Sequence, residues 1–135
     1  MNESKNIVYH TDKLIYVAVP YSHKLTSIQQ LRFEMVNEWC ARQMRNGYIL
    51  FSPISHTHPL AEYGLPGGWD FWVTFDAPFL KACTHMAVLM LPGWEKSVGV
   101  TAETRRFNQE GKPIQFCPYD CDISETEWTQ TYALH

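Results

Sequence analysis

The stretch from Pro92 to Phe107, PGWEKSVGVTAETRRF, holds the residues whose types and spacing best suit catalysis. It follows an apolar run and predicts a loop that enters a helix near Val98, with Ser97 as the N-cap. Gly99 would let a ligand approach the first helical turn, and Glu103 shares its helix face. A carboxylate below such an opening suits nucleophilic attack on the anomeric carbon of a sugar. The alternative is a solvated helix glutamate.

Two aspartates are candidate partners for this glutamate. Asp76 precedes the third apolar run. It either caps a helix with Pro78 in the first turn, or serves as the acid or hydrogen-bond partner of a departing group. Asp70, in Trp-Asp-Phe-Trp, has the same two interpretations. We expect two acidic groups to converge beside one pocket.

The segment after the first apolar run, VPYSHK at residues 19–24, is a second candidate for ligand contact. It lacks the glycines of a phosphate-binding loop of the dinucleotide or nucleoside-triphosphate type, which disfavours an NAD-binding enzyme. Ser22 and His23 could still hold one phosphate or a hydroxyl near a helix start. A plain surface turn is the alternative.

Histidines and tryptophans supply the remaining candidates. His56 and His58 could be a metal pair, but neither a carboxylate nor a cysteine with matching spacing is nearby. We therefore expect no metal and assign both His56 and His58 to the pocket lining or to loop hydrogen bonds. Trp72 and Trp94, together with Trp69, are expected at the pocket mouth, where a planar base could stack on an indole. Membership of the core or a lid is the alternative for these rings.

Composition limits the class of protein. A chain of 135 residues with 45% hydrophobic content predicts one α/β domain over residues 1–135. A net charge of −3, with 11 Lys and Arg spread along the chain, argues against a nucleic-acid partner. The apolar runs fall short of the roughly 20 residues that span a bilayer, and the N-terminus has no signal core. We expect a cytoplasmic protein whose four cysteines are free thiols, because they lie in or beside buried segments and the compartment is reducing. The CPYDC spacing does not fit structural zinc.

The apolar runs and turn signals predict the order of elements. Strands are expected at residues 14–19, 48–51, 86–91 and 113–116, and helices at 27–46, 70–83 and 98–109. We expect Thr26 or Ser27 to cap the first helix, with Gln30 in a capping box, and Gly47 to end it. Residues 52–69 are expected to form a long loop that acts as a lid or pocket wall, and the tail from Ser124 a further helix.

Alternating strands and helices predict a Rossmann-like or flavodoxin-like α/β domain. Its mostly parallel sheet of four to five strands would be flanked by helices and wound right-handedly. In such folds a ligand binds outside the carboxyl ends of the strands, where the strand order reverses. We therefore expect the site after the first and third strands.

Three motifs resemble those of the nucleoside 2-deoxyribosyltransferase superfamily, including its 2′-deoxynucleoside 5′-phosphate N-hydrolase branch. They are Leu-Ile-Tyr16-Val-Ala, Asp76-x-x-x-Leu80 and Ser97-Val-Gly99-Val-x-x-Glu103. The resemblance covers roughly residues 14–117. It is strongest for small bacterial and phage members that also carry SPIxH, WDFW and LPGWxxS, all of which are present here.

The resemblance implies roles for five residues. Glu103 would be the nucleophile, Asp76 the carboxylate that assists departure of the base, and Tyr16 the residue that positions the sugar or the nucleophile. Ser97 would contact the 5′ end of the nucleotide, and Gly99 would give backbone access. The family glycine at the end of the first strand is replaced by valine and proline here, and a family acidic residue before the third strand by threonine. These departures leave the choice between nucleoside and nucleotide open.

The implied reaction is a double displacement on a nucleoside or 2′-deoxynucleoside 5′-monophosphate, through a covalent glycosyl-Glu103 intermediate. Water or a second base would then accept the sugar, so the enzyme would be a hydrolase or a deoxyribosyltransferase. The resemblance implies no cofactor, a small-molecule partner, no membrane, and a homodimer or larger assembly. The alternative function is a non-catalytic nucleotide-binding or sensing module of the same fold. A metal hydrolase using His56 and His58 is a third hypothesis.

Overall fold

The four apolar runs form the predicted parallel strands. The computed structural model describes residues 6–129, and in that range the sheet has the order β2-β1-β3-β4, with every neighbouring pair parallel. The strands are β1 (His10–Ala18), β2 (Tyr48–Phe51), β3 (His85–Leu89) and β4 (Ile114–Cys117). Because β1 lies between β2 and β3, the strand order reverses beside it. The predicted α/β fold is confirmed.

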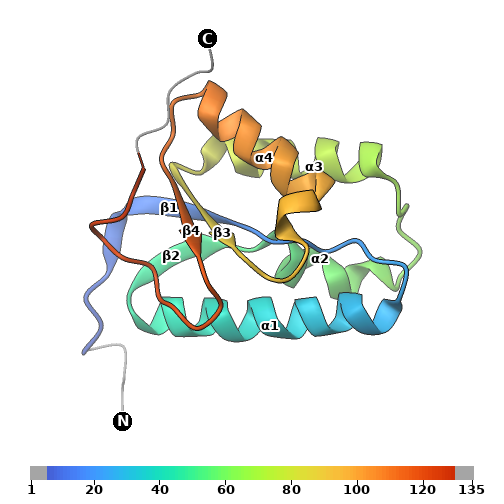
Figure 1. Ribbon diagram of the computed structural model, residues 1–135, viewed down its shortest axis with the longest axis horizontal. Helices are drawn as coiled ribbons and strands as arrows, with labels where there is room; N and C mark the ends of the chain where they lie inside the picture. The colour runs from blue at the N-terminus through green and yellow to red at the C-terminus, as the bar shows by residue number, and fades with distance from the viewer. Residues whose placement is uncertain (1–5, 130–135) are drawn as a thin grey trace.

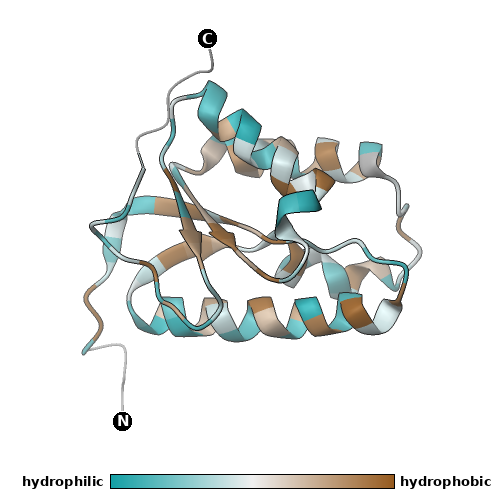
Figure 2. Cartoon of the chain, viewed as in Figure 1, coloured by the Kyte–Doolittle hydropathy of each residue, from teal (hydrophilic) through white to brown (hydrophobic). Residues whose placement is uncertain are grey.

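The strands are covered on both faces. Figure 1 shows α1 (Thr26–Arg45) on one side of the sheet, and α3 (Trp69–Ala82) with α4 (Val98–Gln109) on the other. Strand side chains alternate between the faces. Ile15 and Val17 belong to the core cluster beneath α1, whereas Tyr16 and Ala18 belong to the cluster beneath α3 and α4. In Figure 2 the strands at the centre are brown and α4 is largely teal. Within residues 6–129, no helix combines the length and apolar character needed to cross a membrane.

The first helix begins in a different way from the prediction. Its N-cap is Leu25, so the capping roles expected for Thr26, Ser27 and Gln30 are wrong. The preceding loop is instead fixed by His23, whose Nδ1 accepts a hydrogen bond from the backbone N–H of Leu25 at 3.0 Å. This contact sets the entry of the chain into α1 without a serine or threonine cap.

The end of α1 follows the prediction, because Gly47 has a φ of +95° directly after the C-cap Asn46. A Cβ atom at Gly47 would also collide with the carbonyl oxygen of Val8. The chain therefore needs glycine here for two reasons, the left-handed backbone and the close approach of a second segment.

We expect Gly47→Ala to lower the free energy of unfolding by about 3 kcal/mol or more, since backbone strain and a steric clash add. Gly64→Ala is the matched control, because Gly64 has a φ of +86° but no atom within 4 Å of the position that a Cβ would occupy. The control should lose only about 1 kcal/mol. Urea denaturation of both variants measures the difference, and equal losses would contradict the clash.

Residues 52–69 are not one long loop. Pro53–Ala61 form α2, and Ser52 caps it by accepting a hydrogen bond from the Ser55 N–H at 3.3 Å. Proline at the first helical position and a serine cap are typical helix starts. Histidines and prolines obscured this helix in the sequence. The true connection is limited to residues 62–68.

The helix that follows begins one residue before the expected start, and its N-cap is Gly68. Asp76 therefore lies inside α3, and its interpretation as an N-cap is wrong. The rings of Phe71, Phe75 and Phe79 contact one another at i, i+4 spacing. Such contacts favour continuous helix, here through Pro78.

The tail from Ser124 to Thr129 is not the predicted helix; Tyr132 lies outside the described residues. Thr129 forms an antiparallel bridge with Ile114. The buried Gln115 side chain accepts from the Ser124 N–H and donates to the Ser124 carbonyl, both at 2.8 Å. These bonds hold the start of the segment beside β4. All four cysteines are free thiols, as predicted.

Candidate active site

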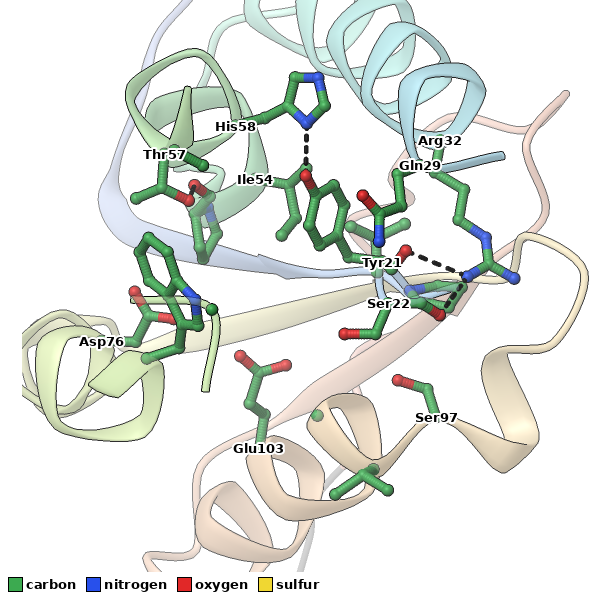
Figure 3. Close-up of a pocket in the computed structure, with 18 of the residues that line it drawn as sticks. Tyr21, Ser22, Gln29, Arg32, Ile54, Thr57, His58, Asp76, Ser97 and Glu103 are labelled. Carbon is green, nitrogen blue, oxygen red and sulfur yellow. Dashed lines mark hydrogen bonds between the residues drawn. The ribbon is translucent and has the colours of Figure 1, made fainter. Parts of the chain in front are cut away.

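A cavity of ≈ 760 Å³ opens at the carboxyl ends of β1 and β3 (Figure 3). This is where the strand order predicts a ligand to bind. Its wall comes from the loop after β1, from α1 and α2, from the 62–68 connection, from α3, and from the start of α4. The volume is within the range of small-molecule sites.

The start of α4 places the predicted nucleophile at this cavity. Ser97 is the N-cap, as predicted, and its Oγ accepts a hydrogen bond from the Val100 N–H at 3.2 Å. Ser97, Gly99 and Glu103 all line the cavity. In Figure 3 the Glu103 carboxylate extends from the helix into the open space, with Ser97 on the same side.

A tyrosine from the sheet holds this carboxylate. Tyr16 is fully buried in β1, and its hydroxyl donates a hydrogen bond of 2.5 Å to Glu103 Oε2. Burial raises the pKa of Tyr16 far above its ordinary value, and the nearby Glu103 and Asp76 charges raise it further. The phenol therefore stays protonated and acts as a fixed donor. The donor engages one carboxylate oxygen of Glu103, Oε2.

Asp76 reaches the same cavity from α3. Its Oδ1 is buried and, within residues 6–129, has no hydrogen-bond partner. A buried acceptor without a partner is costly, so a ligand donor at this position would be favoured. Asp76 and Glu103 also share a smaller cavity of ≈ 70 Å³ with Arg106, between α3 and α4. The two acidic groups converge as expected.

Both carboxyl groups hold their protons more tightly than usual. Burial raises the pKa of Asp76 to about 6. Burial is also the main reason that the pKa of Glu103 rises to about 8, with the Asp76 charge adding to the rise and the Tyr16 hydrogen bond opposing it. Strong shifts caused by burial and by a neighbouring acid in a cleft are typical of functional sites.

Other predicted contacts divide into two groups. Ser22 and Trp72 line the cavity. Asp70, His23, His56 and Trp94 lie outside the cavity wall that the described residues form. Their substrate-binding roles stay predictions that this placement does not support.

Each of these four has a different local environment. His23 orders the loop before α1, as described above. The exposed His56 packs edge-on against Phe51 with ring centroids 6.0 Å apart, and the Trp94 and Phe116 centroids are 5.5 Å apart. Asp70 is exposed in the first turn of α3.

Several cavity residues had no motif in the sequence, and the most connected is Arg32. Its guanidinium donates to the carbonyls of Tyr21 (3.3 Å), Ser22 (3.0 Å) and Pro92 (3.0 Å). Arg32 therefore ties the loop after β1 to the loop after β3, and Figure 3 shows its bonds to the first of these loops. No local signal could have identified it, because its partners are backbone oxygens of two distant segments.

We expect Arg32→Ala to lower the free energy of unfolding by about 1–3 kcal/mol, because three carbonyls lose a charged donor. Arg45→Ala, at the exposed end of the same helix, is the control and should change stability by less than about 0.5 kcal/mol. Chemical denaturation monitored by tryptophan fluorescence compares them. An equal effect of the two substitutions would show that the tie is not stabilising.

The metal hypothesis finds little support in the hydrogen bonds of His58. One ring nitrogen lies 2.5 Å from the Tyr21 hydroxyl, and the other 2.9 Å from Gln30 Oε1. Both nitrogens are thus engaged, whereas a metal ligand needs one free lone pair. In the part of the chain that the structure describes, three or more potential metal ligands do not gather anywhere.

Two of three comparisons with known proteins found a match. The model of a family described as "Domain of unknown function (DUF1937)" matches residues 13–118. No curated protein matches the sequence. A solved structure of a 2-deoxyribosyltransferase from the psychrotolerant bacterium Bacillus psychrosaccharolyticus is 19% identical, with a TM-score of 0.54. The match covers 83% of this chain and 77% of that one. The predicted resemblance is thereby confirmed at the level of the fold.

Proposed function

The chain belongs to the DUF1937 family, and from its cavity we propose that it breaks the N-glycosidic bond of a nucleoside or a 2′-deoxynucleoside 5′-monophosphate. The observation on which this proposal depends is the 2.5 Å hydrogen bond from Tyr16 to Glu103, beside a cavity that Asp76 also lines. The shared fold with a 2-deoxyribosyltransferase supports the same reaction class.

In the first step, Glu103 Oε1 attacks C1′ of the sugar as the bond from C1′ to the base nitrogen breaks. In the reactive form Glu103 is ionised and Asp76 is protonated; Asp76 gives its proton to the departing base, so the electron pair of the broken bond ends on a neutral leaving group. The product is an ester between Glu103 and the sugar. Tyr16 holds the other carboxylate oxygen, which orients the attacking one.

In the second step, an acceptor attacks C1′ and releases Glu103. With water as the acceptor, Asp76 takes the proton and the reaction is hydrolysis, as in retaining glycosidases. With a second base as the acceptor, the reaction is deoxyribosyl transfer. Both outcomes restore the starting protonation of the two acids.

The cavity supports one orientation of the substrate. The base would lie toward Asp76, with Trp72 available for stacking, and the 5′ end toward Ser97 and Gly99. Lys96 and Arg32 also line the cavity, and Lys96 directly precedes Ser97. Positive charge at that end would favour a substrate that carries a 5′-phosphate.

The test is incubation of the protein with the four common deoxynucleosides and their 5′-monophosphates, followed by chromatography for free base. We expect release by the wild type and by Glu95→Gln, which removes an exposed carboxylate close in sequence, but not by Glu103→Gln. Binding without release by the wild type would contradict the proposal and favour the sensing module instead.

A further inference from the structure

A chain of hydrogen bonds runs from the cavity wall to the outer surface of α1. Tyr21 and His58 both line the cavity, and the Tyr21 hydroxyl lies 2.5 Å from His58 Nδ1 (Figure 3). His58 Nε2 lies 2.9 Å from Gln30 Oε1. The Gln30 amide nitrogen then donates to Glu34 Oε2 at 2.8 Å.

The carboxylate at the end of this chain fixes the position of every proton in it. A carboxylate only accepts, so the amide nitrogen of Gln30 must face Glu34 and its oxygen must face His58. An amide oxygen cannot donate, so His58 Nε2 carries a hydrogen. In the neutral imidazole, Nδ1 is then the acceptor, and the hydrogen between His58 and Tyr21 belongs to the tyrosine.

The packing of the imidazole supports this order. The Phe33 ring stacks on His58 with its centroid at 4.2 Å and an interplanar angle of 26°, which holds the imidazole in the plane that both bonds require. Burial also raises the pKa of Tyr21, so the phenol keeps its proton. All donors point away from the cavity toward Glu34, and bonds aligned in one direction strengthen one another.

We propose that Tyr21 determines substrate specificity: its hydroxyl oxygen accepts a hydrogen bond from an O–H or N–H group of the bound nucleoside. The only proton of the hydroxyl is given to His58, so the oxygen offers only lone pairs to the cavity. His58 and Gln30 are positioning residues that hold this state. The inference rests on the proposed function, because that function supplies the ligand.

Two groups of a deoxynucleoside could be the donor, the 3′-hydroxyl of the sugar or the exocyclic amine of the base. Both would be bound by the same acceptor. A ligand that presents only an acceptor at this point would face two lone pairs and would be disfavoured.

The proton order is tested without any ligand. ¹⁵N NMR of the histidine side chains at pH 8, above the ordinary titration range of histidine, distinguishes the two neutral tautomers. The His58 signals are assigned from their loss in His58→Asn. We expect hydrogen on Nε2. Hydrogen on Nδ1 would overturn the proposal, because the tyrosine would then be free to donate into the cavity.

The ligand contact is tested in a Glu103→Gln background, which prevents turnover. Calorimetry measures the binding of 2′-deoxyadenosine and 2′-deoxycytidine, of their 3′-deoxy analogues, and of the two analogues without the exocyclic amine. Tyr21→Phe should lower the binding affinity for both parent nucleosides by roughly three- to tenfold. Either the 3′-deoxy analogues or the analogues without the exocyclic amine should bind equally well to the proteins with and without Tyr21→Phe. The group that this series lacks is the donor to Tyr21.

The control is Tyr9→Phe, which removes the same hydroxyl from a 49% exposed tyrosine and should leave all affinities unchanged. An equal loss of binding affinity for every nucleoside and analogue on Tyr21→Phe, or no loss for any of them, would overturn the specificity role. Failure of the Glu103→Gln protein to bind any probe would instead contradict the proposed function and remove the ligand role of Tyr21 with it.

Discussion

Glu103→Gln is expected to lower kcat for base release by at least about 10⁴-fold, because the amide cannot form the ester with C1′. The amide oxygen can still accept the hydrogen bond from Tyr16, so the cavity should keep its shape. Single-turnover assays with the best deoxynucleoside or monophosphate give the rate. Mass spectrometry of acid-quenched wild-type protein should show one added glycosyl unit on the peptide that contains Glu103.

A truncated variant tests the same role in a second way. Glu103→Ala leaves room for a small carboxylate, and added formate should restore part of the lost base release, whereas it should not help Glu103→Gln. A Glu103→Gln protein that retains more than about a tenth of the wild-type rate would contradict the covalent mechanism.

The kcat/KM of the wild type is expected to have a bell-shaped pH profile with its maximum at about pH 7. The two acidic groups have raised pKa values, about 6 for Asp76 and about 8 for Glu103, so between these values the pair shares one proton, which rests mainly on Glu103; the reactive form is the minority in which Asp76 carries it. At lower pH both are protonated and the nucleophile is lost. At higher pH both are ionised and the proton for the leaving base is lost, so each limb should fall about tenfold per pH unit.

Asp76→Asn separates the two limbs. Without a proton to give, the variant should lose roughly 10²-fold in kcat/KM near pH 7 and should lose the alkaline limb completely. The acidic limb should persist, and its midpoint should report the pKa of Glu103 alone, which burial still raises although the Asp76 charge no longer does. An unchanged alkaline limb would show that another group supplies the proton.

The sequence was most informative where the signals are local. Ser97 is followed by a helix whose first turn it caps, so both the helix and the direction of Glu103 follow from neighbours in the chain. The strands are short apolar runs covered on both faces, and their order along the chain was enough to predict the parallel sheet. The resemblance added Tyr16, whose contact with Glu103 joins residues far apart in the chain.

The sequence was least informative where position depends on tertiary contacts. Trp72 and Trp94 were both expected at the pocket mouth, yet one lines the cavity and the other packs on Phe116. Trp72 lies on α3, whereas Trp94 begins a short 3-10 helix, Trp94–Lys96, before α4. Arg32 was missed as a cavity residue because its partners lie on other elements, and no spacing along the chain encodes those contacts.

The burial of two carboxyl groups at the cavity also has a consequence for folding. In the unfolded chain Glu103 would titrate near its ordinary value of 4.5, whereas in the folded protein its pKa is about 8. Glu103 therefore contributes to the free energy of unfolding at pH values below its unfolded-state pKa. This contribution is lost as the pH rises through its native-state pKa. Ionisation of Glu103, which attack on a sugar requires, thus lowers the free energy of unfolding. A homologue without catalytic activity would gain stability at neutral pH if asparagine replaced Asp76 and glutamine replaced Glu103.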